Sequence, residues 1–225
     1  MKRTEINALM RKAAAFLREH HFHMPPFAWW SPGDWKARGA ECVEIVETQL
    51  GWDITDFGSG DFDKVGLLLF TVRNGAFDQP LGKTYAEKIM IAEPGQVTPT
   101  HFHHQKKEDI INRGGGDLEI RLWNSLPDGE LADTPVTVSI DSIPRTVPAG
   151  GIVTLSPGQS IYLPQRLYHS FWGKRATVLI GEVSSVDDAR EDNAFHEPVG
   201  RFPQIDEDEE PLHLLTKDYA RYCNA

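Results

Sequence analysis

Four residues in two segments have the types and spacing of a metal site. His101 and His103 are two positions apart in VTPTHFH, a segment that reads as a β-strand. Because successive side chains of a strand point to opposite faces, both imidazoles emerge on the same face. Glu108 and His169 offer a carboxylate and a third imidazole. The set predicts a divalent metal ion held by three nitrogens and one oxygen.

Glu108 sets a geometric requirement on the chain. It lies an odd number of positions after His103, so an uninterrupted strand would aim its carboxylate at the wrong face. We therefore expect a bend or bulge over residues 104–107. His169 must lie on a strand that a barrel folds beside the strand of His101.

Three further residues could move or stabilise a proton beside the metal. Glu182 lies in the apolar segment ATVLIGEVSS, and a carboxylate in a barrel interior has the raised pKa that suits a base. Lys106 falls in the expected bend, and Lys88 lies on the preceding strand, where a cation could stabilise an oxyanion or relay a proton. Either lysine could equally be solvated, because lysine is rarely fully buried.

The elements that must position these side chains are mainly strands. From about residue 52 onward, short β-rich segments alternate with turn signals and no helical interval separates them, which favours a sandwich or barrel over a parallel doubly wound sheet. The run Gly114-Gly115-Gly116 opens a strand rather than a helix, so we interpret it as a turn and not as a phosphate-binding loop.

Helices are expected before the strands. Apolar residues from Ile6 to Leu17 recur with helical spacing, with Thr4 available as the N-cap. Ser31 followed by Pro32 predicts a second, short helix. Residues 41–50 fit a third helix, although their alternation leaves a strand open. Residues 206–210 are all acidic and predict a solvated loop.

Composition narrows the class of protein. The 225 residues allow one large domain or two small ones. The formal net charge of −10 disfavours nucleic acid as a partner. No run approaches the roughly 20 apolar residues that span a bilayer, so we expect no membrane insertion. Cys42 and Cys223 are too few for a disulfide framework, which fits a reducing cytoplasm.

The spacing of the site residues resembles the two sequence motifs of the cupin superfamily. The first motif is matched at every position by Gly95, His101, His103, Glu108 and Gly115. The second is matched by Gly158, Pro164 and His169. Two positions depart from the second motif, because Arg166 replaces a glycine and Gly173 replaces an asparagine. The resemblance implies a mainly β fold, the cupin double-stranded β-helix or jelly-roll barrel, with the N-terminal helices packed outside.

Over nearly the whole chain the sequence is similar to the D-lyxose isomerase family. The segments that carry this resemblance are HFHMPPFAWWSPGDW, LGWDITDFGSGDF, THFHHQKKEDIINRGGG, GEVSSVDDAREDN and VGRFPQIDEDEE. The resemblance implies interconversion of D-lyxose with D-xylulose, and of D-mannose with D-fructose, by a homodimer that uses Mn²⁺. The ligand types alone would also accept Co²⁺, Zn²⁺, iron or nickel.

A sugar substrate would be bound by aromatic rings that stack on it and by hydrogen-bonding groups around the metal. Phe171 is the first stacking candidate, and Arg201 and Asp192 are candidates for holding hydroxyl groups. Trp29, Trp30 and Trp172 could also stack on a sugar, but core packing or a dimer contact is the more usual role of such side chains.

The expected organisation is one cupin domain over residues 1–225. Within it, residues 1–51 form a helical extension, 52–200 the β-barrel core and 201–225 a C-terminal segment. Two other functions remain open at this point. Three histidines and a glutamate also suit an Fe(II)-dependent cupin dioxygenase, and the same ligands could serve a non-catalytic sugar-binding or metal-storing cupin.

Overall fold

A curved antiparallel sheet forms the body of the protein in this computed structural model, which describes residues 1–76, 82–188, 191–200 and 204–223. The strands are β1 Gly51–Thr55, β2 Leu67–Arg73, β3 Tyr85–Ala92, β4 Thr98–His103, β5 Glu108–Asn124, β6 Val136–Ile140, β7 Ile143–Val147, β8 Gly151–Leu155, β9 Ser160–Leu163, β10 Leu167–Ser185 and β11 Asn193–Phe195. The order across the sheet is β1-β2-β3-β10-β5-β9-β6-β7. In addition, β4 pairs with β10 and β11, and β8 pairs with β5.

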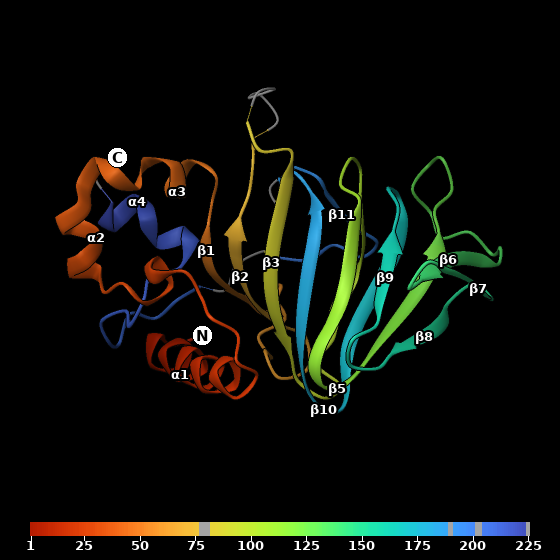
Figure 1. The fold of residues 1–225 in the computed structure, drawn as a ribbon, viewed down its shortest axis with the longest axis horizontal. Coiled ribbons are helices and arrows are strands. Elements are labelled where there is room, and N and C mark those ends of the chain that lie inside the picture. Colours follow the sequence, from red (N-terminus) through yellow and green to blue (C-terminus); the bar gives the residue numbers. More distant parts are fainter. Residues whose placement is uncertain (77–81, 189–190, 201–203, 224–225) are drawn as a thin grey trace.

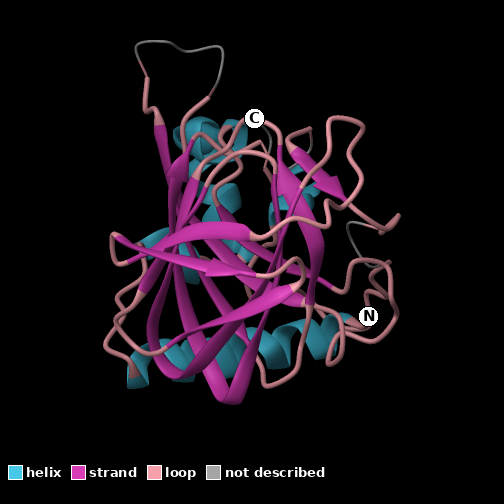
Figure 2. Ribbon diagram, turned by 90° about the vertical axis from the view of Figure 1, so that its right-hand side faces the viewer, coloured by secondary structure: helices cyan, strands magenta, loops and turns pink. Residues whose placement is uncertain are grey.

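The helices gather at one end of the sheet, beside β1 and β2 (Figure 1). The α-helices are α1 Arg3–Glu19, α2 Pro32–Arg38, α3 Val43–Glu47 and α4 Tyr219–Tyr222, and the 3-10 helices are η1 Pro26–Trp29, η2 Gly39–Cys42 and η3 Thr216–Asp218. Figure 2 shows the sheet curling back on itself with the helices on its outer side. The predicted mainly β, cupin-type fold with external helices is therefore confirmed. No helix in the described ranges has both the length and the apolar composition needed to cross a bilayer.

The strands β2, β3 and β10 are apolar on both faces because both faces are covered. Met90 and Ile180 point into the barrel core, whereas the alternating neighbours Ile89 and Leu179 pack outward against the helices. Lys88 lies two positions before Met90, and Glu182 lies two positions after Ile180, so each shares a strand face with that apolar residue. The strand alternation therefore turns both charged side chains toward the interior.

The helix predictions are confirmed except for one cap. Helix α1 buries an apolar stripe from Ile6 to Leu17 against the outer face of the sheet. Its N-cap is Lys2 and not Thr4, because the Thr4 hydroxyl donates to Asp208 at 2.8 Å. Ser31 caps α2, as expected. Residues 39–47 are helical, so the strand alternative for that region is wrong.

The glycine run is not a turn. Gly114, Gly115 and Gly116 lie within β5, which pairs with β10 on both sides of the run with shifts of register. Gly115 has a φ of 88°, and a Cβ there would lie 2.1 Å from the carbonyl oxygen of Thr177. Glycine is therefore needed for a kink that lets one long strand serve two parts of the barrel.

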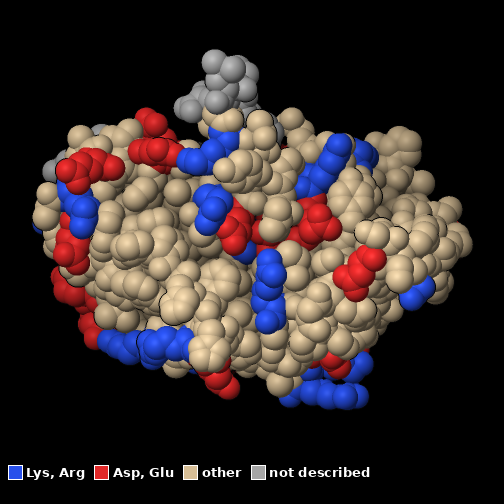
Figure 3. Space-filling model, in the orientation of Figure 1, with Lys and Arg blue, Asp and Glu red and all other residues tan. Residues whose placement is uncertain are grey.

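The acidic run does more than face solvent. Glu207 and Asp208 accept hydrogen bonds from Arg3 and Thr4 of α1, and Glu209 accepts from Asn7. These contacts join the C-terminal segment to the first helix. Elsewhere, acidic and basic side chains are interspersed on the face shown in Figure 3, so no field of a single sign covers it.

Candidate active site

Three histidines meet on the inner side of the barrel. Ligand nitrogens of His101, His103 and His169 all lie within 4.8 Å of one another. His169 of β10 stands directly opposite His101 of β4 in the antiparallel register. That register shifts by one residue between Thr98 and His101, so β4 contains a bulge beside the cluster.

Backbone carbonyls orient two of the rings. Nδ1 of His101 donates to the oxygen of Pro99 at 2.8 Å, and Nδ1 of His169 donates to the oxygen of Leu167 at 3.1 Å. Each bond places the proton on Nδ1 and leaves the Nε2 lone pair free to bind a cation. Burial lowers the pKa of His101 well below its ordinary value and that of His169 to about 4, so both rings are neutral at pH 7.

The Glu108 carboxylate completes the cluster. Its Oε1 lies 3.2 Å from Nε2 of His169 and 3.5 Å from Nε2 of His103. Burial alone would raise the pKa of Glu108, but the Lys106 ammonium holds it well below the usual range. Oε1 is buried without a hydrogen-bond partner. An ionised oxygen in that state, beside the imidazole nitrogens of His169 and His103, fits a bound divalent ion.

The expected bend between the ligands is present, and Asp192 shapes it. The chain leaves β4 after His103 and enters β5 at Glu108. The Asp192 carboxylate accepts hydrogen bonds from the backbone nitrogens of Gln105 at 2.7 Å and Lys106 at 2.9 Å. Asp192 does not line the cavity beside the metal ligands. Its contacts therefore hold the loop, and a sugar contact by this residue stays a prediction.

A network of buried charges lies next to the histidines. Nζ of Lys106 is 2.7 Å from Oε2 of Glu108 and 2.7 Å from Oε1 of Glu182. Lys88, opposite Glu182 in the β3–β10 register, contacts the same Oε1 at 3.4 Å and Asp187 at 2.7 Å. The lysine side chains are only 2% and 8% exposed, so the solvated alternative is wrong for both.

The ion pairs also fix the charge state of the network. Burial alone would lower the pKa of Lys106, but the three carboxylates around it raise that pKa well above its ordinary value. Burial alone would raise the pKa of Asp187, but the two lysines lower it. The network therefore carries fixed charges of both signs at neutral pH.

A cavity of about 270 Å³ joins the histidine cluster to the charged network. Its polar lining consists of Asp53, Thr55, Lys88, Thr98, His101, His103, Lys106, Glu108, His169, Glu182 and Asn193. Its apolar lining includes Phe57, Leu67, Leu69, Met90, Ile110, Phe171, Phe195 and Val199. A polar pole with metal ligands and an apolar wall suit a small polyhydroxylated ligand.

The predicted aromatic and hydroxyl-binding residues have different locations. Phe171 lines the cavity, whereas Arg201 lies outside the described residues. Trp29 packs on Trp52 with ring centroids 5.8 Å apart, and Trp30 packs on Trp35 at 5.1 Å. These two tryptophans therefore have the packing role. Trp172 is also outside the cavity lining and donates to Glu119 at 2.8 Å.

Sequence reasoning missed four polar residues of the cavity wall, Asp53, Thr55, Thr98 and Asn193. A signal existed for two of them. Asp53 and Thr55 flank the buried Ile54, so in a strand they share the face opposite to that apolar residue. Asn193 lies on a short strand opposite His103, a pairing that no local pattern could reveal.

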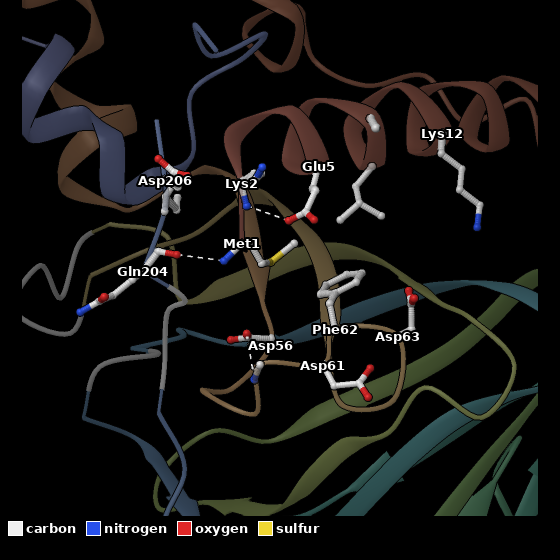
Figure 4. A pocket seen from close by; sticks show the side chains of 14 residues that line it. Met1, Lys2, Glu5, Lys12, Asp56, Asp61, Phe62, Asp63, Gln204 and Asp206 are labelled. Carbon is white, nitrogen blue, oxygen red and sulfur yellow. Dashed lines mark hydrogen bonds between the residues drawn. The ribbon is translucent and has the colours of Figure 1, made fainter. Parts of the chain in front are cut away.

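A second cavity, of about 940 Å³, lies between α1 and residues 56–63 (Figure 4). Its wall combines acidic side chains such as Asp61 and Asp63 with Lys2 and Lys12. The N-terminal amine at its edge donates to the oxygen of Gln204 at 3.0 Å. It holds none of the clustered histidines, so its larger size does not make it the reaction site.

Comparison with known proteins agrees with this geometry. The family model described as D-lyxose isomerase matches residues 1–219, which include the histidines, Glu108 and the charged network. The chain belongs to the D-lyxose isomerase family. Within this family it is 47% identical over 226 residues to the D-lyxose/D-mannose isomerase of Escherichia coli O157:H7, covering 99% of this chain and 100% of the relative. It is 46% identical to the Serratia proteamaculans protein of the same name, with 99% of each chain covered.

Solved structures show the same fold beyond the D-lyxose isomerase family. The L-ribose isomerase of Cellulomonas parahominis matches with a TM-score of 0.60 at 17% identity, over 92% of this chain and 98% of that one. The L-ribose isomerase of Acinetobacter sp. DL28 matches with a TM-score of 0.60 at 16% identity, with the same coverage. At such identities the likeness establishes the architecture.

Proposed function

We propose that this protein is a metal-dependent aldose-ketose isomerase that interconverts D-lyxose with D-xylulose and D-mannose with D-fructose. The observation that carries the proposal is the cavity in which Glu108, the three histidines and the Glu182 network face one small space. Full-length relatives named D-lyxose/D-mannose isomerase support the choice of sugars. The two aldoses have the same configuration at C2, C3 and C4, so one cavity can orient both.

His101, His103, Glu108 and His169 would hold the metal. A divalent ion there polarises the sugar carbonyl and stabilises the negative charge that develops on its oxygen. We propose Mn²⁺ as the working ion, as the family resemblance implies, although Co²⁺ and Zn²⁺ fit the same donors. The support from this chain is the ligand set itself, with the unpartnered Oε1 of Glu108 at its centre.

Glu182 would be the base that moves the proton between C2 and C1. The contacts of Lys106 at 2.7 Å and Lys88 at 3.4 Å are both to Oε1, so the lysines hold this end of the side chain beside the cavity, and we propose that Oε2 exchanges the proton. The lysine ammonium groups would stabilise oxygen atoms of the sugar as it passes through an enediol. Phe171 and Met90 belong to the apolar wall and would exclude water from that intermediate.

The test is product analysis with the Mn²⁺-loaded protein. We expect D-lyxose to yield D-xylulose, and D-mannose to yield D-fructose, at rates that are the same in air and under nitrogen. D-Ribose is the control sugar. No turnover of either aldose with Mn²⁺, Co²⁺ or Fe²⁺ would contradict the proposal, and sugar-dependent oxygen uptake would favour the dioxygenase instead.

The non-catalytic alternative is tested by Glu182. A sugar-binding or metal-storing protein would bind D-lyxose without converting it, and Glu182→Gln would then change nothing that can be measured as turnover. We propose catalysis because a storage site would not require a buried carboxylate that two lysines hold beside the histidine cluster.

The remaining expectations are also proposals. We propose a homodimer in the cytoplasm, acting on a free sugar, with residues 1–225 folding as one domain whose barrel core spans 52–200. The free thiols of Cys42 and Cys223 support a reducing compartment. Light scattering of the purified protein would measure the oligomeric state, with twice the chain mass as the expected result.

A further inference from the structure

Asp187 is buried beside the active site without lining it. It follows the end of β10, its side chain is 8% exposed, and it does not belong to the cavity wall. Its Oδ1 lies 2.7 Å from Nζ of Lys88 and 3.3 Å from Nζ of Lys106. A carboxylate that contacts both active-site lysines from behind cannot touch a sugar directly.

We propose that Asp187 is a positioning residue for the isomerase reaction, which holds the two lysine ammonium groups in the arrangement that Glu182 needs. The inference rests on the proposed function. The distances carry it, because Lys88 is 2.7 Å from Asp187 but 3.4 Å from Glu182. Asp187 therefore draws Lys88 away from the base and leaves Lys106, at 2.7 Å, as the close partner of Glu182.

The loss of this carboxylate has a definite geometric consequence. Without the Asp187 carboxylate, Lys88 keeps its ion pair with Glu182, and we expect the ammonium group to close on it. Two close ammonium partners would then hold the Glu182 carboxylate away from the position where it reaches C1 and C2 of the sugar. Small misplacements of a reacting group cost up to about 100-fold in rate.

The framework of the sheet fixes where Asp187 stands. Asn74, buried just after β2, donates from Nδ2 to the oxygen of Asp187 at 2.8 Å and accepts from its backbone nitrogen at 3.1 Å. Oδ1 of Asn74 also accepts from the backbone nitrogen of Gly75 at 2.9 Å. The backbone of Asp187 is thus held by the segment that follows β2, as a positioning role requires.

The experiment compares Asp187→Asn with wild type in the Mn²⁺-loaded protein. We expect kcat for D-lyxose to fall by about 10–100-fold while KM changes by less than about 3-fold. Two further readouts are the manganese content per chain and the affinity for D-arabinitol, the unreactive polyol of D-lyxose, measured by calorimetry. Both should stay within about 3-fold of wild type, because Asp187 touches neither ligand.

Asp218→Asn is the matched control. Asp218 is also a buried carboxylate in an ion pair, with Arg3, but it lies among the helices and not in the cavity wall. Its variant should lose stability and keep the kcat of the folded protein. Equal kcat in Asp187→Asn and wild type would overturn the inference. So would a parallel loss of polyol affinity and manganese, which would indicate general structural damage.

A second variant keeps the test open if Asp187→Asn does not fold. Asp187→Glu retains the charge but moves the carboxylate by one methylene, so its kcat should lie between that of wild type and about one tenth of it. A wild-type kcat in Asp187→Glu would then overturn the inference. Failure of the proposed function would be seen differently, because wild type itself would then not convert D-lyxose. In that case the inference about Asp187 would be rejected together with the proposed function.

Discussion

Two buried charged clusters in this protein are built in opposite ways. At the helical end, the Arg3 guanidinium is fully buried and donates to Glu207 and Asp218 through four hydrogen bonds of 2.7–3.0 Å. In the barrel, Oε1 of Glu108 and Nδ1 of His103 are buried without a hydrogen-bond partner. The first cluster satisfies its own hydrogen bonds, whereas the second leaves atoms that could bind an ion.

This difference separates structure from function. A buried charge costs several kcal/mol unless it is paired and hydrogen-bonded, so a cluster that serves the fold closes on itself. A cluster that serves a ligand must keep atoms available and is held in place by its surroundings. Here the backbone oxygens of Pro99 and Leu167 hold two histidines in that open arrangement.

The largest effect is expected from breaking the cluster of His101, His103, Glu108 and His169 in the barrel. His169→Ala should lower kcat/KM by about 10³-fold or more and reduce the bound manganese, because one of the proposed metal ligands is removed. His104→Ala is the control, since this exposed histidine lies just beyond the ligand pair. Steady-state rates and metal analysis measure both. Normal turnover in His169→Ala would remove that residue from the site.

The second-largest effect is expected from removing Glu182, the proposed base. Glu182→Gln keeps the shape of the side chain but cannot accept the proton, so kcat should fall by about 10²–10⁴-fold while manganese content stays at the wild-type level. Glu119→Gln is the matched control, because Glu119 also pairs with a lysine, Lys174, but outside the cavity. Full activity in Glu182→Gln would assign the proton transfer to another group.

Breaking the cluster of Arg3, Glu207 and Asp218 at the helical end should affect the stability of the fold alone. Arg3→Met leaves two carboxylates without their partner and should lower the free energy of unfolding by about 3–5 kcal/mol, with kcat of the folded protein unchanged. Arg38→Met, at the exposed pair with Glu41 at 3.8 Å, should change it by less than about 1 kcal/mol. Denaturant titration checks both. A large loss of kcat in Arg3→Met would show that the two clusters are coupled.

The smallest effect is expected on how the stability of the fold depends on pH in acid. The hydrogen bond from Arg3 lowers the pKa of Glu207 below its ordinary value of 4.5. The stabilisation from a carboxylate with a lowered pKa is present above the unfolded value and is lost as the pH falls through the folded value. We therefore expect wild type to lose stability below about pH 4.5 more steeply than Glu207→Gln. Parallel pH dependences would show that this pair contributes nothing.

The sequence contained most of the fold where the signal was local. The doubly buried strands β2, β3 and β10 were visible as apolar runs, and His101 and His103 carried the strand period. The bend before Glu108 followed from parity alone. These features depend on neighbours in the chain, so pattern and spacing could reveal them.

The errors arose where distant segments decide the structure. Thr4 is not the N-cap of α1, and its hydroxyl donates instead to Asp208, a partner 204 positions away. The kink at Gly115 belongs within a strand because β10 continues beside it. The contact between Asp187 and Lys88 of the adjacent strand β3 was equally invisible in the sequence. No periodicity encodes such pairings.

One residue shows how the motif departures are accommodated. Arg166 stands where the second cupin motif has glycine, and its φ of 59° is the left-handed conformation that glycine adopts most easily. Its side chain donates to the oxygen of Leu126 at 3.0 Å and lies over the ring of Phe102. The turn is therefore kept with arginine in place of glycine, with these contacts to offset the strain.

The most direct test of the central claim is a metal titration. The protein is stripped with a chelator, Mn²⁺ is added in known amounts, and D-xylulose formation from D-lyxose is followed against bound metal. We predict no turnover without metal and a rate that rises linearly to a plateau at one ion per chain. Turnover by the metal-free protein, or none at full manganese occupancy, would contradict the assignment of the histidine cluster as the catalytic centre.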